Sequence, residues 1–423
     1  MGKKANNILV RSNYTYDFHK KALLNENMTR FLSDPKEKFD VILMEWFFSD
    51  LFAGIPPLFK CPFIWMASTD AHWQILSLAG DVTNPVSTPD IFDYPLTTLW
   101  GRTLKLIDYV KTYFIAKILY GTLEQLSYDT IYSSIAEKRG VSMPLYTDAV
   151  YNASLVFINS HPAVGVPHNI PLNTKYIGGY HMDTDLKSIP KHLQNIMDNA
   201  KNGMIFFCLG SNIESKFMSN KMTQSLLRMF SKFKQTVVWK YEDELKNVPA
   251  NVYLEKWVPQ LNILAHPNLK VFITHGGRMS ITEAVHYGVP IIGMPAYADQ
   301  FVNVRVVVEK NLGIEVTLTD NLAEDLEVAI KKILDDPIYS NNARELSSIY
   351  RHRLLSPGQE LVYWTEHVVK SRGAKYLRPA ARKMPLYQKL YLDIILALIC
   401  IISLTKFILC FVRKMVKVKE KLN

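Results

Sequence analysis

Short apolar runs alternate with helix-like segments along the second half of the chain, and this alternation limits the fold more than any other feature. Runs of strand length occur at 204–211, 236–241, 252–257, 269–277 and 290–295. Amphipathic or helix-forming segments separate most of them, and Leu322, Leu326, Ile330 and Ile333 define a further helix by their spacing. Such alternation predicts an α/β fold with a mostly parallel sheet.

The first half follows the same plan less regularly. Residues 39–46 and 62–68 are strand-like runs with a helical segment between them, which predicts a βαβ unit. A long helical stretch covers 102–137, and 153–160 is a third buried strand. Residues 161–180 are rich in Pro and Gly and are expected to form loops that lead into a linker.

Positive charge is concentrated at one end of the chain. The 423 residues are enough for two or three domains and carry a formal net charge of +10. Thirteen Lys and Arg against two acids lie from Lys370 to Asn423, so that segment has a charge of +11 and the rest is close to neutral. The excess surrounds one apolar stretch, which favours a membrane surface over nucleic acid as its partner.

That apolar stretch is Ile394–Val412. Its nineteen residues would form a helix about 28 Å long, close to the ~30 Å hydrocarbon core of a bilayer. Lys406 interrupts it, and the competing interpretation is a buried core helix. Lys419 and Lys421 near the C-terminus resemble a di-lysine retrieval signal of the endoplasmic reticulum, although a basic tail beside anionic lipid has the same composition.

The N-terminal residues show no apolar leader, so no signal peptide is predicted in this chain. Either the bulk of the chain lies in the cytosol behind a C-terminal anchor, or an upstream part is missing. The cysteines are too few and too scattered for a disulfide framework or a structural zinc site. They are Cys61, Cys208, Cys400 and Cys410.

Polar groups follow several strands of the second half. Ligands in doubly wound sheets bind beyond the carboxyl ends of the strands. The groups at those ends are Gly210-Ser211, Trp257 with Gln260, His275-Gly276-Gly277, and Pro295 through Asp299-Gln300. The chain has no GxxxxGK[ST] loop and no GxGxxG after a strand, which argues against a P-loop nucleotidase and against a dinucleotide oxidoreductase.

These residue types suit the parts of a nucleotide sugar. The glycine turn after His275 opens a helix whose N–H groups would attract a diphosphate. Glu283 can accept hydrogen bonds from ribose hydroxyls, and Trp257 offers a flat face on which a base can stack. Asp299 and Gln300 can hold a polyhydroxylated ring. Each residue alone has a structural explanation, as cap, core or loop, so the conjunction carries the hypothesis.

The run from Trp257 to Gln300 resembles the signature of the UDP-glycosyltransferases, in their membrane-bound animal branch, and EWFFSDLFAGIPPLF resembles the insect members most closely. The resemblance implies a GT-B fold, with two Rossmann-like domains facing a cleft and one C-terminal transmembrane helix. The implied parts are an incomplete acceptor-binding domain at 1–180, a UDP-sugar-binding domain at 181–385, a juxtamembrane segment and transmembrane helix at 386–412, and a basic tail at 413–423.

The resemblance also assigns roles around the nucleoside and the sugar. Trp257 matches the residue that stacks on uracil, and Gln260 matches one that contacts the nucleoside. Glu283 matches the ribose-binding carboxylate. Asp299 and Gln300 match the pair that holds the sugar hydroxyls.

Four further positions match diphosphate contacts: Ser211, His275, Gly277 and Ser280. Met279 departs from the pattern, because many members have Asn there and a thioether cannot donate a hydrogen bond to an oxyanion.

The implied reaction is inverting transfer of a hexose, with glucose favoured, and needs no metal or other cofactor. In the family a histidine after the first strand is the base, and an acid after a later strand orients it; Glu45 falls at the place of that acid. The histidine loop lies upstream of this chain in the family, so we expect this chain to bind UDP-sugar weakly or not at all and to transfer the hexose poorly. His19 does not match that loop, and His72 is a candidate substitute base.

The aromatic residues of the first half allow two interpretations, an apolar acceptor pocket or ordinary core. They are Trp46, Phe47, Phe48, Trp65 and Trp73.

Two function classes follow. The first is an enzyme with UDP-sugar and a small lipophilic acceptor as substrates, held in the endoplasmic-reticulum membrane by a single pass, with its domains lumenal in the complete protein. The second is a non-catalytic truncated membrane partner that pairs with full-length glycosyltransferases. Membrane lipid and a homo- or hetero-oligomer are expected partners, and nucleic acid is not.

Overall fold

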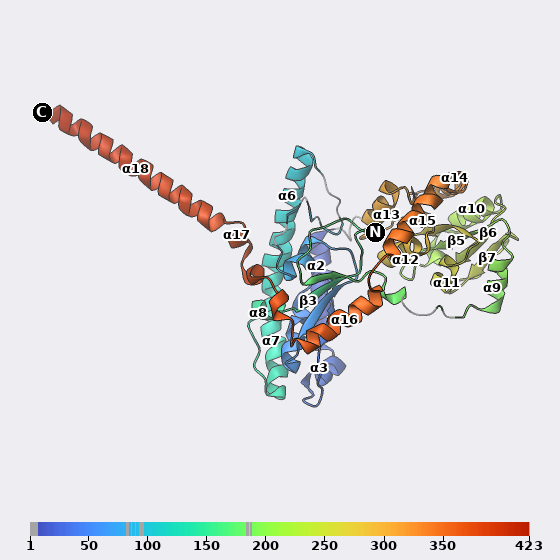
Figure 1. The fold of residues 1–423 in the computed structure, drawn as a ribbon, viewed down its shortest axis with the longest axis horizontal. Helices are drawn as coiled ribbons and strands as arrows, with labels where there is room; N and C mark the ends of the chain where they lie inside the picture. The colour runs from blue at the N-terminus through green and yellow to red at the C-terminus, as the bar shows by residue number, and fades with distance from the viewer. Residues whose placement is uncertain are drawn as a thin grey trace.

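Two parallel sheets, each with its own helices, form the body of the protein, and one long helix extends from it (Figure 1). The computed structural model describes residues 7–81, 84–85, 87–88, 90–92, 97–182, 186 and 188–422, with side chains as far as 415. The two sheets confirm the predicted α/β architecture.

The first sheet has the order β1-β2-β3-β4, all parallel. Its strands are β1 (Ile42–Glu45), β2 (Phe63–Ala67), β3 (Leu155–Ile158) and β4 (Thr174–Tyr176). The sequence predicted the first three strands and assigned the region of β4 to loops, because β4 has the sequence Thr-Lys-Tyr and is not an apolar run. Strand β1 lies at the edge of this sheet, and Leu43 on it is exposed.

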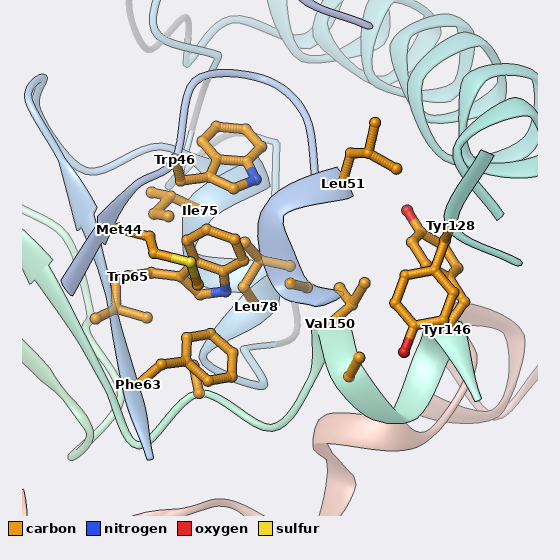
Figure 2. Close-up of a cluster of buried hydrophobic side chains, with 14 of the residues drawn as sticks. Met44, Trp46, Leu51, Phe63, Trp65, Ile75, Leu78, Tyr128, Tyr146 and Val150 are labelled. Atoms are coloured by element: carbon orange, nitrogen blue, oxygen red, sulfur yellow. The ribbon is translucent and has the colours of Figure 1, made fainter. Parts of the chain in front are cut away.

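Helices cover one face of this sheet and form its larger core. They are α2 (Ile8–Leu24), α3 (Glu26–Ser33), η1 (Leu51–Gly54), α4 (Ile55–Phe59), α5 (Trp73–Leu78), α7 (Gly121–Arg139) and α8 (Tyr146–Val150). Helix α6 (Leu99–Tyr113) and the π-helical η2 (Phe114–Tyr120) precede α7, and α6 contacts Trp73 through Tyr109. Figure 2 shows part of this core, with Trp46 and Trp65 turned into it beside Ile75 and Leu78. Trp46, Trp65 and Trp73 are buried, which favours the core interpretation for these aromatic residues.

The second sheet has six parallel strands in the order β10-β9-β8-β5-β6-β7. They are β5 (Met204–Cys208), β6 (Thr236–Lys240), β7 (Val252–Glu255), β8 (Leu269–Thr274), β9 (Ile291–Gly293) and β10 (Gly313–Glu315). Alternate residues of β5 point to opposite faces, so Ile205 and Phe207 join one core while Met204 and Phe206 join the other. Burial on both faces explains the continuous apolar runs.

Two layers of helices cover this sheet. One core includes α10 (Asn220–Phe230) and α14 (Leu322–Asp335). The other includes α9 (Lys191–Asp198), α11 (Gln260–Leu264), α12 (Arg278–Tyr287), α13 (Gln300–Glu309) and α15 (Pro337–Arg351). The second unit is therefore a three-layer, doubly wound α/β domain, as predicted.

The chain then returns to the first sheet. Helix α16 (Pro357–Lys370) packs on the face of the first sheet that is opposite to α7. Val368 of this helix is fully buried in one cluster with Ile64, Leu155 and Phe157. Residues 357–370 follow the second domain in chain order, yet they cover the first sheet (Figure 1).

Beyond α16, short helical turns lead through α17 (Leu386–Lys389) to α18 (Leu392–Leu422), which projects away from the body (Figure 1). Within the described residues, Leu392–Met415 is the one stretch long and apolar enough to cross a membrane, and none of its most apolar window is buried. The predicted span Ile394–Val412 lies inside it. Its exposure argues against the core-helix interpretation.

Candidate active site

The strand order gathers the predicted site residues at one edge of the second sheet. Strands β5 and β8 are neighbours at its centre, with β9 and β6 beside them. The carboxyl ends of parallel strands meet at the same edge, so the loops that follow them lie together. Ser211 follows β5 and is exposed, His275 follows β8 directly, and Asp299 lies between β9 and α13.

His275 is held between two glycines. A Cβ on Gly210 would lie 2.6 Å from its Cε1, and a Cβ on Gly277 would lie 2.6 Å from its Nε2. Gly210 also has a φ of +81°, which L side chains rarely adopt. Burial lowers the pKa of His275 to about 4, so the ring is neutral at neutral pH. The imidazole can therefore offer one N–H to an anion without carrying a charge itself.

The N-terminus of α12 lies directly beside this histidine. Its N-cap, Gly277, has no side chain with which to accept the first-turn N–H groups. Those groups and the helix dipole favour an anion at this end of the helix. Met279 is 46% exposed there, and its thioether adds no donor.

Glu283, on the same helix, is the centre of a polar cluster. Nε2 of Gln260 donates to its Oε2 at 2.6 Å and to Oγ of Ser280 at 3.2 Å. Nε2 of His181 lies 2.9 Å from its Oε1, so both carboxylate oxygens have a partner. The structure thus brings together three residues predicted for the nucleoside, ribose and diphosphate, and it adds His181, which the sequence did not single out.

Trp257 projects from the same edge. Its side chain is 73% exposed, so the indole is accessible for stacking. Nζ of Lys240, at the end of β6, lies 5.8 Å from the centre of the ring. The same Nζ donates to the carbonyl of Gly210 at 3.1 Å and pairs with Oε1 of Glu242 at 2.8 Å. Lys240 therefore connects the tryptophan to the glycine turn beside His275.

Asp299 and Gln300 are fixed by hydrogen bonds. Nδ2 of Asn303 donates to Oδ2 of Asp299 at 2.7 Å and to the carbonyl of Gly276 at 3.0 Å. Oε1 of the buried Gln300 accepts from the backbone of Ala296 and Tyr297 at 2.9 and 3.1 Å. The side-chain carbonyl of Gln300 is therefore occupied by hydrogen bonds from the loop, whereas its side-chain NH₂ group can donate to a ligand hydroxyl.

The two domains meet at the start of α12. The buried Arg278 donates from Nη2 to Oδ2 of Asp70, which follows β2, at 3.4 Å, and from Nη1 to the carbonyl of Val164 at 3.4 Å. The backbone N–H of Val166 donates to the same carboxylate oxygen at 2.9 Å. The carboxyl edge of the first sheet therefore faces the helix that opens the candidate diphosphate site.

The candidates for acid–base chemistry lie in the first domain. Glu45 ends β1 and is exposed. His19 on α2 is buried and its pKa is lowered by burial, although the negative charge of Glu45 partly opposes this shift. His72 is 1% exposed and packs against Trp46 and Phe48. Burial lowers the pKa of His72 to about 4, so this ring is neutral and enclosed.

Sequence reasoning missed His181, Lys240, Arg278 and Asp70. A signal existed for Lys240, since it is a polar residue at the end of a predicted strand on the edge already identified. Arg278 lies inside the run already identified, but its partner Asp70 and the histidine His181 come from distant parts of the chain, so these contacts depend on how the domains pack. No residue spacing in the sequence indicates such contacts.

Comparisons with known proteins show which family the chain resembles along its length. The profile of the family described as "UDP-glucoronosyl and UDP-glucosyl transferase" matches residues 3–422. "UDP-glucosyltransferase 2" of Dactylopius coccus is 32% identical over 390 residues, covering 90% of this chain and 74% of that protein. "UDP-glucuronosyltransferase 2B15" of Rattus norvegicus is 29% identical over 431 residues, covering 97% of this chain and 77% of the relative.

The fold has solved counterparts as well. The structure of the spinosyn forosaminyltransferase SpnP superposes with a TM-score of 0.57 at 14% identity, over 82% of each chain. That similarity supports the expected GT-B arrangement of two Rossmann-like domains. The match of the family profile to nearly the whole chain extends beyond the fold, and the protein belongs to the UDP-glucoronosyl and UDP-glucosyl transferase family.

Proposed function

We propose that the protein binds a UDP-sugar at the carboxyl edge of its second sheet and transfers the hexose to a hydroxyl of a small lipophilic acceptor. The observation that carries the proposal is the cluster of Gln260, Ser280 and Glu283 beside the open N-terminus of α12. The cluster places a carboxylate that can bind ribose, Glu283, next to a helix N-terminus that can bind diphosphate. The name of the 32%-identical insect relative favours glucose as the sugar.

The proposed step is an inverting displacement. The acceptor oxygen attacks the anomeric carbon, the bond from that carbon to the diphosphate oxygen breaks, and the hydroxyl proton passes to a base. The α12 N–H groups and the neutral His275 stabilise the charge that develops on the departing UDP. Trp257 and Glu283 hold the nucleoside, while Asp299 and Gln300 orient the sugar.

Proton removal from the acceptor requires a positioned base, which is typically worth about 10²–10⁴-fold in rate. His19 and His72, near the first sheet, are both buried and have lowered pKa values. Neither ring is therefore open to the acceptor, and Glu45 can orient a histidine but cannot replace one.

For the location, we propose a single-pass protein of the endoplasmic-reticulum membrane with both domains lumenal. The exposed apolar helix α18 supports the anchor. The di-lysine pattern of Lys419 and Lys421 supports the endoplasmic reticulum as the compartment. Because such a signal is read in the cytosol, it also supports lumenal domains on the other side of the membrane.

Calorimetric titration of the purified chain with UDP tests the binding half of the proposal. Trp257→Ala should weaken UDP binding by about 1–3 kcal/mol, the range measured for base–aromatic stacking, while Trp257→Phe should retain most of the affinity. Glu283→Gln should weaken binding of UDP more than binding of inorganic diphosphate, because only UDP carries a ribose. Unchanged UDP affinity in both Trp257→Ala and Glu283→Gln would refute the assignment of the site.

A second candidate function, a non-catalytic partner of full-length glycosyltransferases, is favoured by one observation. Among the described residues, strand β1 is an edge of the first sheet. Leu43 on this strand is exposed, as are Phe39 before it and Phe47 after it. An unpaired edge of this kind can accept a strand from another chain. Co-purification with a full-length relative that is lost in Leu43→Lys would support this role, and co-purification unaffected by that change would count against the edge.

A further inference from the structure

Helices α6 and α7 and the π-helical turn η2 between them form one continuous helix (Figure 1). Many of its exposed side chains are apolar. Eleven large apolar side chains on it are exposed, and we call them the apolar stripe. They are Leu99, Trp100, Leu104, Leu106, Ile107, Val110, Phe114, Ile118, Leu119, Leu123 and Leu126.

The stripe is a face of the helix and not part of the core. Leu106, Val110 and Phe114 recur four residues apart and therefore lie above one another. The buried side is a different one: Tyr109 packs against Trp73 with ring centres 4.9 Å apart. Val110 and Phe114 are 58% and 60% exposed.

A surface of this kind requires a partner. Soluble monomers rarely expose contiguous apolar patches larger than a few hundred Å², and larger patches mark contacts with proteins or membranes. Exposed apolar side chains here follow the helix from residue 99 to 126, whereas scattered single residues would be unremarkable. The question is therefore which partner covers the stripe.

The position of the stripe points to a bilayer. A cavity of about 440 Å³ is lined by Lys117 and Gln125 from this helix and by Leu386 and Lys389 from the segment before α18. Lys383 of that segment also forms an ion pair with Asp148, close in sequence to α7. The apolar span begins three residues after Lys389, and α18 leaves the body on the side of α6 and α7 (Figure 1). The helix is thus held next to the membrane anchor.

The charges beside the stripe fit the same partner. On the helical wheel of α6, Arg102 lies at one border of the apolar side chains, and Lys111 lies among them, between Trp100 and Leu104. Both side chains are exposed. Asp108 is the one exposed acid on α6. Basic residues at the border of an apolar face, with a tryptophan on it, are typical of helices that lie in the interface of a membrane with anionic lipid. Trp100, 69% exposed, is that tryptophan.

We propose that the apolar stripe lies in the boundary between headgroups and acyl chains of the bilayer that α18 spans. The first domain then contacts the membrane along α6 and the start of α7 in addition to its anchor. Burial of the apolar side chains drives this contact, and Arg102 and Lys111 add attraction to anionic headgroups.

The test uses the full chain in nanodiscs of phosphatidylcholine and phosphatidylserine at about a 4:1 ratio. Cys61, Cys400 and Cys410 are replaced by Ser, and a fluorophore is attached at Val110→Cys. The matched control carries it at Ser348→Cys, an exposed position on α15 of the second domain. We expect a lipid with a nitroxide near its headgroup to quench position 110 at least about threefold more than position 348, and aqueous iodide to show the reverse order. Equal quenching at both positions would overturn the proposal.

A second measurement separates lipid from a second copy of the chain. Ile107→Glu combined with Leu106→Glu changes only exposed positions, so folding should persist, and it should abolish the lipid quenching of a label at Phe114→Cys. In discs that hold a single copy, the label at 110 should stay protected from iodide. Protection that appears only when two copies share a disc would refute the lipid contact in favour of self-association.

Discussion

Met279 occupies a position at the anion-attracting end of α12 where a hydrogen-bond donor would be useful. Its thioether is exposed and cannot donate to a phosphate oxygen. We predict that Met279→Asn tightens UDP binding about five- to tenfold, since a hydrogen bond to a charged oxygen is worth roughly 1.5 kcal/mol or slightly less at an exposed site. Titration calorimetry measures the change. Met279→Leu is the control, and equal affinities for the two variants would contradict a phosphate at this position.

Glu124 is a buried carboxyl group whose protonation should make stability depend on pH. Burial, together with the negative charge of Asp50, raises its pKa to about 7, while the hydroxyl of Tyr146 donates to its Oε2 at 2.7 Å. Between about pH 4.5 and 7 the folded protein therefore binds more protons than the unfolded chain, and the free energy of unfolding contributed by this group falls as pH rises.

The prediction compares Glu124→Gln with the natural protein at several pH values. Gln keeps the acceptor for Tyr146 and removes the titration. The free energy of unfolding of the variant minus that of the natural protein should therefore rise by on the order of 2 kcal/mol from pH 5 to pH 8. Urea unfolding at each pH measures this difference. The buried histidines act in the opposite direction but equally in both proteins. Glu137→Gln, exposed on the same helix, should show no such trend, and a flat difference for Glu124→Gln would disprove the assignment.

Helix α12 is the element that joins the two domains through a buried ion pair. Asp70→Ala would leave the guanidinium of Arg278 and the N–H of Val166 without their shared acceptor. Loss of one partner of a buried pair costs about 3 kcal/mol or more. We predict a loss of this size in urea unfolding. Glu366→Ala, which removes the exposed pair with Lys370, should have no measurable effect. Similar effects for the two variants would mean that the pair between the domains is not energetically important.

At the level of elements, the strands and helices that could be predicted are those with a clear apolar run or a helical apolar spacing in the sequence. The runs around Phe206, Phe272 and Ile292 were found because strands buried on both faces are continuously apolar. Strands β4 and β10 escaped because neither is a continuous apolar run: β4 is Thr-Lys-Tyr and β10 is Gly-Ile-Glu. Helix α2, which packs against η2 and α7, lacks a clean apolar face and gave little signal.

The candidate site was predictable for a different reason. One continuous run of the sequence contains Trp257, Gln260, His275 and Glu283, so these residues could be identified together from the sequence alone. His181 contacts the same carboxylate from 102 positions away. Such a contact depends on the packing of the domains, and an isolated histidine after a glycine turn gives no indication of it.

For the molecule as a whole, α16 is the connection on which the arrangement of the domains depends. It follows the second domain in sequence but covers the first sheet, and an amphipathic pattern cannot say which sheet a helix will cover. Val368→Ala should lower the free energy of unfolding by about 2 kcal/mol, because Val368 is fully buried between the helix and β2 and β3.

The matched control for this prediction is Val362→Ala on the same helix, where the side chain is 54% exposed and little burial is lost. Thermal unfolding of the two variants gives the comparison. Equal melting temperatures for both variants would show that α16 does not contribute to the core of the first domain.

The return of α16 also determines which half of the protein the anchor holds. In the proposed membrane arrangement, force from the bilayer acts through α18 on the first domain, and the second domain is joined to it by contacts such as the Arg278–Asp70 pair, by the linker and by α16. A hinge movement at these contacts would let the second domain swing while the anchored domain keeps its place in the lipid.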